Sequence, residues 1–214
     1  MSVDKDSDVP QLSAATFAAL QEFYQEQEER ELKEKQINDI HEGVFEEDWQ
    51  LSQFWYDDST IERLVQIALG TVGLNAKIAL VSCPTIFQEM KRKAGPSAEV
   101  TLFEYDKRFA AFGSDFIFYD YKSPLSIPRD RSNYYDIVLA DPPFLSHECL
   151  TKIAVTIKYL SKEKIILCTG AVMAELAHKL LDLQEINFKP KHRNNLANEF
   201  WCFTNFHEKE RENK

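Results

Sequence analysis

The sequence predicts an α/β fold in which helices cover both faces of a mostly parallel β-sheet. Short, apolar, strand-like runs alternate along the chain with stretches whose apolar residues recur at helical spacing. The last two strand-like runs follow one another with no helix between them, which indicates an antiparallel hairpin at the end of the sheet. With 214 residues, 44% of them hydrophobic, the chain can form one domain with a full core and an additional arm.

Residues 1–49 are predicted to form an acidic, partly helical arm that precedes the folded domain at residues 50–214. The first 50 residues contain 14 acidic and 4 basic side chains, whereas the rest of the chain contains 21 of each. Such an arm either aids solubility or attracts a basic protein. A helix is expected over residues 12–40, with one stripe of apolar side chains at helical spacing: Leu12, Ala15, Ala19 and Phe23.

The domain is predicted to begin with a helix over residues 61–69. The polar segment 58–60 offers a cap for its start, apolar side chains line one face, and Gly70 and Gly73 end it. The apolar run KIALVS at residues 77–82 then predicts a buried strand.

The remaining elements follow the same two patterns, apolar runs for strands and one-sided apolar faces for helices, with Gly or Pro at several boundaries. In chain order they are a helix over 85–94, strand 99–104 (EVTLFE), short helix 107–112, strands 115–119 (DFIFY) and 135–140 (YDIVLA), helix 146–160, strand 164–169 (KIILCT), helix 171–181, and strands 184–189 and 199–206 (EFWCFTNF). Six or seven strands in this order match the methyltransferase variant of the doubly wound fold.

The strongest functional signal is the tetrapeptide Asp141, Pro142, Pro143 and Phe144, which directly follows the strand at 135–140. In sheets of this kind ligands bind outside the carboxyl ends of the strands. Two prolines remove two N–H donors and stiffen the backbone, so the segment presents mainly acceptors. A target amino group needs acceptors for its hydrogens, and Phe144 supplies a flat wall beside it. The alternative is a proline-rich turn that merely ends a strand.

Other post-strand residues are candidates for a nucleoside site. Glu104 follows one strand, and its two carboxylate oxygens match the two hydroxyl donors of a ribose. Asp120 can accept from an adenine amino group while Tyr121 covers the ring. For these acids the alternative is an ordinary surface loop.

The turn after the first strand excludes two common nucleotide sites. Ser82 and its neighbours contain no glycine, and none of the 6 glycines of the chain lies there. Both the dinucleotide fingerprint and the phosphate-binding P-loop require glycines at this point. Ser82 is kept as a candidate for a cofactor without phosphate, with an ordinary loop as the alternative.

The aromatic segment Gln53, Phe54, Trp55 and Tyr56 lies just before the first helix of the domain. Three consecutive aromatic residues in this place either cover a ligand or fasten the arm onto the core. The four cysteines are far apart and form no CxxC pair, so we expect reduced thiols and no metal site. No apolar run is long enough to span a bilayer, and no secretory signal is expected.

These residues resemble a known family. The DPPF tetrapeptide is similar to the [DN]-PP-[YFW] motif of amino-methyltransferases acting on adenine, glutamine and lysine nitrogens. The wider pattern resembles the small eukaryotic lysine methyltransferases of translation elongation factor 1-alpha, formerly described as N6-adenine DNA methyltransferases. The resemblance covers residues 50–206 and rests on four segments: SQFWYDDST (52–60), LFEYDKRF (102–109), FYDY (118–121) and YDIVLADPPF (135–144).

The resemblance implies a seven-stranded, Rossmann-like fold with S-adenosylmethionine as methyl donor. It implies a lysine of elongation factor 1-alpha as acceptor, in a cytoplasmic protein that we expect to be monomeric. Asp141 through Phe144 become the target-nitrogen site, Glu104 the ribose ligand, and Asp120 with Tyr121 the adenine contacts. Tyr56 falls in a segment that closes over the cofactor.

Two other functions remain open at this point. An adenine-N6 methyltransferase of DNA or RNA would need a basic groove, and only the short stretch 189–193 (KPKHR) offers one. We therefore expect no stable nucleic-acid partner. A non-catalytic scaffold would not need the complete DPPF segment or the two post-strand acids.

Overall fold

The computed structural model describes residues 21, 24, 47–194 and 196–207. It divides the chain into two compact units, residues 1–44 and 45–214. Gln21 and Tyr24 are helical. The rest of the helix predicted over residues 12–40 lies outside the described residues.

A seven-stranded sheet forms the centre of the second unit, in the order β3-β2-β1-β4-β5-β7-β6. The first five strands of this order pair in parallel, and β7 pairs antiparallel with both of its neighbours. The strands are β1 (Lys77–Val81), β2 (Glu99–Glu104), β3 (Phe116–Phe118), β4 (Tyr135–Ala140), β5 (Ser161–Gly170), β6 (Gln184–Glu185) and β7 (Phe200–Thr204). This arrangement confirms the predicted methyltransferase fold, with its antiparallel end.

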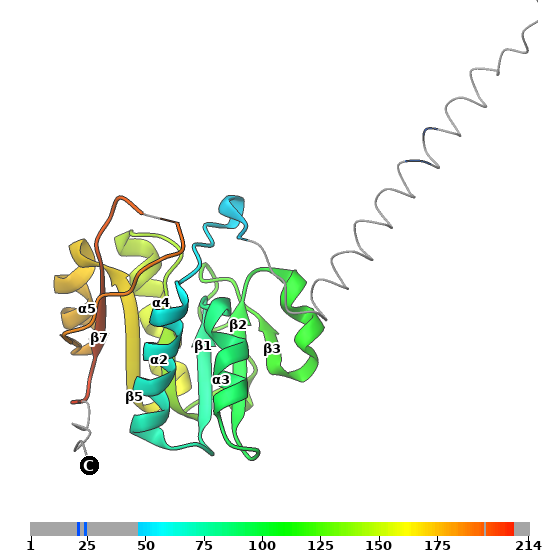
Figure 1. Cartoon of the computed structure of the whole chain (residues 1–214), viewed down its shortest axis with the longest axis horizontal. Helices are drawn as coiled ribbons and strands as arrows, with labels where there is room; N and C mark the ends of the chain where they lie inside the picture. Colours follow the sequence, from blue (N-terminus) through cyan, green and yellow to red (C-terminus); the bar gives the residue numbers. More distant parts are fainter. Residues whose placement is uncertain (1–20, 22–23, 25–46, 195, 208–214) are drawn as a thin grey trace, which may run out of the picture. The chain divides into compact units, whose positions relative to one another are not determined.

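Helices cover both faces of the sheet (Figure 1). Helices α2 (Asp58–Val72) and α3 (Phe87–Lys93) pack on one face with residues such as Ile78 and Leu80 of β1. Helices α4 (His147–Leu160) and α5 (Ala174–Leu181) pack on the other face with Ala79 and Val81. Alternate residues of one buried strand therefore contribute to two separate core layers.

Short 3₁₀ turns make most of the remaining connections. They are η1 (Trp49–Leu51), η2 (Pro84–Ile86), η3 (Lys107–Asp115), η4 (Arg129–Arg131) and η5 (Ala171–Met173). The short helix predicted over residues 107–112 is thus a 3₁₀ segment, and Gly113 with φ 60° allows the sharp turn inside it.

Several predicted boundaries differ from those in the structure, three of them for identifiable reasons. Helix α2 begins earlier because Asp57 caps it by accepting the N–H of Thr60. Gly70 lies inside this helix, and Gly73 with φ 87° ends it. The strand predicted over residues 184–189 is reduced to β6, because the chain turns from Ile186 onward and Pro190 has no N–H to donate to a ladder.

Candidate active site

A cavity of about 390 Å³ opens where the carboxyl ends of β1, β2 and β4 meet. The chain leaves β1 in one direction toward β2 and reaches β4 on the other side, so this is the switch point of the sheet. The cavity has the volume expected of a small-molecule site. Eight of the nine predicted site residues line it: Ser82, Glu104, Asp120, Tyr121, Asp141, Pro142, Pro143 and Phe144.

The segment after β4 lines the cavity with a half-buried acid and a more exposed aromatic ring. The N–H of Asp141 donates to the carbonyl of Val81 at 3.0 Å, which continues the sheet pairing by one residue. Pro142 is buried, whereas Phe144 is 44% exposed. The ring of Phe144 lies 5.8 Å from that of Tyr121, so two aromatic rings from different strand ends form one wall.

Tyr56 is the ninth predicted site residue, and it does not line the cavity. Its side chain is fully buried, and its hydroxyl donates to Oδ2 of Asp141 at 2.6 Å. Burial and the neighbouring Asp141 raise the pKa of Tyr56 well above its usual value, so the phenol stays protonated as a donor. The geometry therefore makes Tyr56 a support of Asp141.

Two acids of the cavity have strongly raised pKa values. The pKa of Asp141 is raised to about 7, mainly by burial, with the Tyr56 hydrogen bond lowering it and the nearby Glu104 raising it. Burial also raises the pKa of Glu104 to about 7, against the backbone N–H groups of Asp106 and Tyr105. Two acids that titrate near neutral pH in one cavity are typical of a functional site.

The turn after β1 adopts a left-handed backbone conformation without the glycine that usually occupies such a position. Ser82 has φ 54°, in the left-handed region, and its N–H donates to the carbonyl of Phe103 at 2.9 Å. The next residue, Cys83, is buried, and its thiol lies 3.5 Å from the carbonyl of Leu139. A left-handed serine thus keeps the turn tight enough for the backbone to border the cavity.

Asp120 and Tyr121 follow β3 and also line the cavity. Oδ1 of Asp120 accepts the N–H of Lys122 at 2.8 Å, which fixes the loop in a short Asx turn. Both residues belong to the lining of the cavity, and the ring of Tyr121 lies beside that of Phe144. Their role as adenine contacts stays a prediction.

The aromatic segment before α2 both borders the cavity and is fastened to the core. Phe54 and Trp55 line the cavity, so this part of the segment covers the site. Tyr56 forms an isolated antiparallel bridge with His192, and their rings lie 4.8 Å apart. The N–H of Asp57 donates to the carbonyl of Lys191 at 2.9 Å. Phe54 and Trp55 therefore border the cavity, while Tyr56 and Asp57 bind the segment to residues 191–192. The arm that the second interpretation concerns lies outside the described residues.

The basic stretch at residues 189–193 is engaged with the fold. Lys189 forms an ion pair with Glu199, and Arg193 pairs with Asp58 at 3.3 Å and lies over the ring of Trp55. Burial lowers the pKa of His192. These charges are largely compensated within the domain, which does not favour a groove for a nucleic-acid backbone.

Several cavity residues had no signal in the sequence. Leu196, Ala197 and Asn198 come from the loop before β7 and line the cavity, although their spacing indicated only a connection. Gln53 also lines it and is nearly buried, at 7% exposed. For Gln53, the sequence offered one indirect sign: its partners Asp106 and Arg108 are opposite charges two residues apart, shortly after a predicted strand.

The described residues offer neither a cluster of metal ligands nor a helix suited to cross a membrane. Within residues 21, 24, 47–194 and 196–207, no three or more His, Cys, Asp or Glu side chains gather closely enough to hold a metal ion. Over the same residues, no helix combines the length and the apolar character needed to cross a membrane.

Comparison with known proteins adds sequence relatives and a fold neighbour. Residues 47–208 match a protein family described as probable N6-adenine methyltransferase. EEF1A lysine methyltransferase 1 of Gallus gallus is 52% identical to this chain, over 95% of it and 97% of its own length. EEF1A lysine methyltransferase 1 of Homo sapiens is 48% identical over 96% of each chain. The branched-chain polyamine synthase of Thermus thermophilus shares the fold, with a TM-score of 0.58 and 10% identity over 75% of this chain and 58% of its own.

Proposed function

This chain belongs to the family described as probable N6-adenine methyltransferase, and on that premise we propose that it methylates a lysine of translation elongation factor 1-alpha with S-adenosylmethionine. The observation that carries the proposal is Asp141, half-buried at the switch point of the sheet, with one oxygen held by Tyr56 and two prolines after it. Curated relatives at 48–52% identity over almost the full chain bear the name of this activity.

The cavity has the features that an adenosyl cofactor requires. Glu104 and Asp120 offer carboxylate oxygens to hydroxyl and amino donors, and Tyr121 offers a ring face. The turn at Ser82 brings backbone close to the cavity without the glycines of a phosphate site. S-adenosylmethionine carries no phosphate, so this turn suits it better than it suits a dinucleotide.

Asp141 is the residue that positions the acceptor nitrogen. A free lysine has a pKa of about 10.4, so at neutral pH only about one in a thousand is the neutral nucleophile. Bound S-adenosylmethionine supplies an electrophilic methyl group on a positively charged sulfur. Ionised Asp141, whose pKa is about 7, accepts a hydrogen bond from the neutral amine and so orients the lone pair of the nitrogen toward the methyl group.

Tyr56 and the aromatic wall define how the amine is held. Because Tyr56 binds Oδ2 of Asp141, we assign Oδ1 to the amine. The rings of Phe144 and Tyr121 exclude water from the reacting nitrogen and tolerate a cationic product by cation–π attraction. A cytoplasmic, monomeric protein is part of the same proposal, and the four buried cysteines without disulfides support the cytoplasmic location.

Transfer of labelled methyl groups tests the choice of acceptor. The pure protein is incubated with radiolabelled S-adenosylmethionine and, separately, with eukaryotic cell extract and with adenine-containing DNA and RNA. We expect label on one protein band at the size of elongation factor 1-alpha. Label on nucleic acid alone would establish the adenine activity in place of the lysine activity. No label and no cofactor binding would indicate a scaffold.

A further inference from the structure

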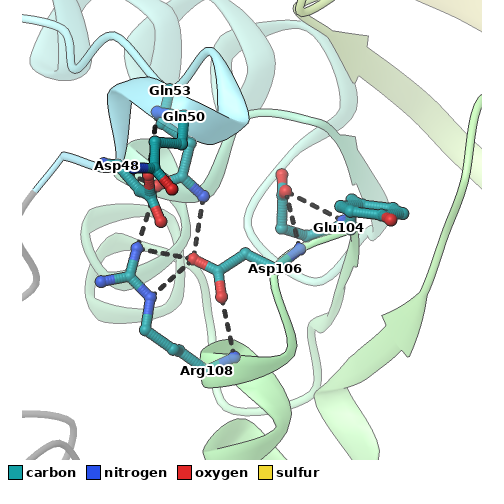
Figure 2. Close-up of polar contacts among 7 residues, drawn as sticks. Asp48, Gln50, Gln53, Glu104, Asp106 and Arg108 are labelled. Atoms are coloured by element: carbon teal, nitrogen blue, oxygen red, sulfur yellow. Dashed lines mark hydrogen bonds and ion pairs between the residues drawn. The ribbon is translucent and has the colours of Figure 1, made fainter.

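Gln53 joins the segment before α2 to the turn after β2 (Figure 2). Its Nε2 donates to Oδ2 of Asp106 at 3.0 Å, and its Oε1 accepts from Nη2 of Arg108 at 3.1 Å. The same Oε1 accepts the backbone N–H of Asp48 at 3.2 Å. With one end of the amide facing an acceptor and the other facing two donors, only one orientation of the side chain satisfies the site.

Asp106 connects this amide to Glu104, the acid assigned to the ribose (Figure 2). Its N–H donates to Oε1 of Glu104 at 3.1 Å, beside the N–H of Tyr105 at 2.9 Å. Its Oδ1 accepts the N–H of Arg108 and caps η3, while its Oδ2 pairs with the guanidinium at 2.7 Å. One nearly buried residue, 5% exposed, therefore fixes Glu104, η3 and Gln53 together.

Fold stability alone is a weak reason for this arrangement. A buried pair of opposite charges is often no more stable than apolar side chains of the same volume. The network does join two parts of the cavity wall that are distant in sequence, because Gln53 lines the cavity and so do Glu104 and Tyr105. Planar donors and acceptors specify the spacing between these walls in a way that apolar contacts do not.

We propose that Gln53, Asp106 and Arg108 form a latch that holds residues 50–55 against the end of β2 and thereby sets the affinity for the methyl donor. This inference rests on the proposed function, since it assumes that the cavity receives S-adenosylmethionine. The three are positioning residues: they act through the orientation of Glu104 and through the segment that carries Phe54 and Trp55.

The substitution Gln53→Glu tests the latch with almost no change in volume. It replaces the donor that faces Oδ2 of Asp106 by an acceptor and places a third acid beside Glu104 and Asp106. We expect the Kd for S-adenosylmethionine, measured by calorimetry on the full chain, to rise at least 10-fold. The loss should appear in the KM for S-adenosylmethionine far more than in kcat or in the KM for the protein substrate.

Two further variants separate the latch from a general loss of folding or charge. Gln184→Glu adds the same charge on the exposed strand β6, outside the cavity, and should leave the Kd within 2-fold of the parent. In Gln53→Glu combined with Asp106→Asn, donor and acceptor exchange places while the total charge of the pair is kept. This combination should recover part of the lost affinity, since the hydrogen bond between positions 53 and 106 is restored in the opposite direction while the pairing of Oδ2 of Asp106 with Arg108 is lost.

A Kd for Gln53→Glu within 2-fold of the parent overturns the latch while the proposed function stands. An equal loss of affinity in the double variant also overturns it, because the network then has no directional role. If the parent protein itself binds no S-adenosylmethionine, the proposed function fails and the latch fails with it.

Discussion

Removing one hydroxyl, in the substitution Tyr56→Phe, gives the sharpest local test of Asp141. The phenol is fully buried and donates to Oδ2 of Asp141 at 2.6 Å, so the substitution keeps the ring and deletes a single hydrogen bond to the acid. The bond favours the ionised form of Asp141, whose pKa is already raised to about 7 by burial and by Glu104. Its loss raises that pKa further.

The size of the effect follows from the kind of bond. A hydrogen bond to a charged acceptor contributes about 1.5–3 kcal/mol. At about 1.4 kcal/mol for each factor of ten, the rate of methyl transfer at neutral pH should fall roughly 10- to 100-fold. The acidic limb of the pH–rate profile should move upward by about one to two units for the same reason.

Initial rates at saturating S-adenosylmethionine and protein substrate, measured from pH 6 to 9, give both quantities. Tyr159→Phe is a matched control. The hydroxyl of Tyr159 makes a single long hydrogen bond, 3.4 Å to the carbonyl of Pro128, and Tyr159 does not line the cavity. We expect this control to keep the parent profile. A Tyr56→Phe protein with an unmoved acidic limb and a rate within 2-fold of the parent would refute the assignment of Tyr56 as the support of Asp141.

Three further predictions concern the cofactor acid, the pH dependence of stability and the core. Glu104→Gln should weaken S-adenosylmethionine binding, measured by calorimetry, roughly 10- to 100-fold, because only the ionised carboxylate is a full acceptor. In the parent protein, binding should strengthen between pH 6 and 8 as Glu104 ionises, and the variant should lack this pH dependence. In the folded protein, Glu104 and Asp141 have pKa values of about 7, above those of the unfolded chain. The stability that these two acids contribute without ligand is therefore fully present below about pH 4 and is lost as the pH rises through 7. Thermal melting of the ligand-free protein should show this fall, and a curve as steep in Glu104→Gln would contradict it. Leu64→Ala, at a fully buried position, should lower the free energy of unfolding by about 2–5 kcal/mol in urea titrations, while the exposed Leu74→Ala should change it by less than about 0.5 kcal/mol.

The fold was predictable because its signals are local. Buried parallel strands read as continuous apolar runs, as in β2 and β4, and both were located to the residue. The error at β6 has the same origin, because residues 186–189 have strand-like composition while a proline downstream removes the ladder. Composition reports burial, and ladder geometry decides where a strand ends.

The site was predictable where it lies directly after strands, and unpredictable where it depends on long-range pairing. Asp141 and Glu104 follow β4 and β2, so the rule of carboxyl ends locates them. The bond from Tyr56 to Asp141 spans 85 positions, and the bond from Gln53 to Asp106 spans 53. No periodicity in the sequence encodes such contacts, and only the folded chain reveals them.

Mass spectrometry of purified elongation factor 1-alpha, after incubation with S-adenosylmethionine and either the parent protein or Asp141→Asn, tests the central claim most directly. We predict that the parent adds methyl mass to one lysine, and that Asp141→Asn binds the cofactor but adds none within the same time. Methylation by Asp141→Asn at the parent rate, or an elongation factor left unmodified by the parent protein, would contradict the account.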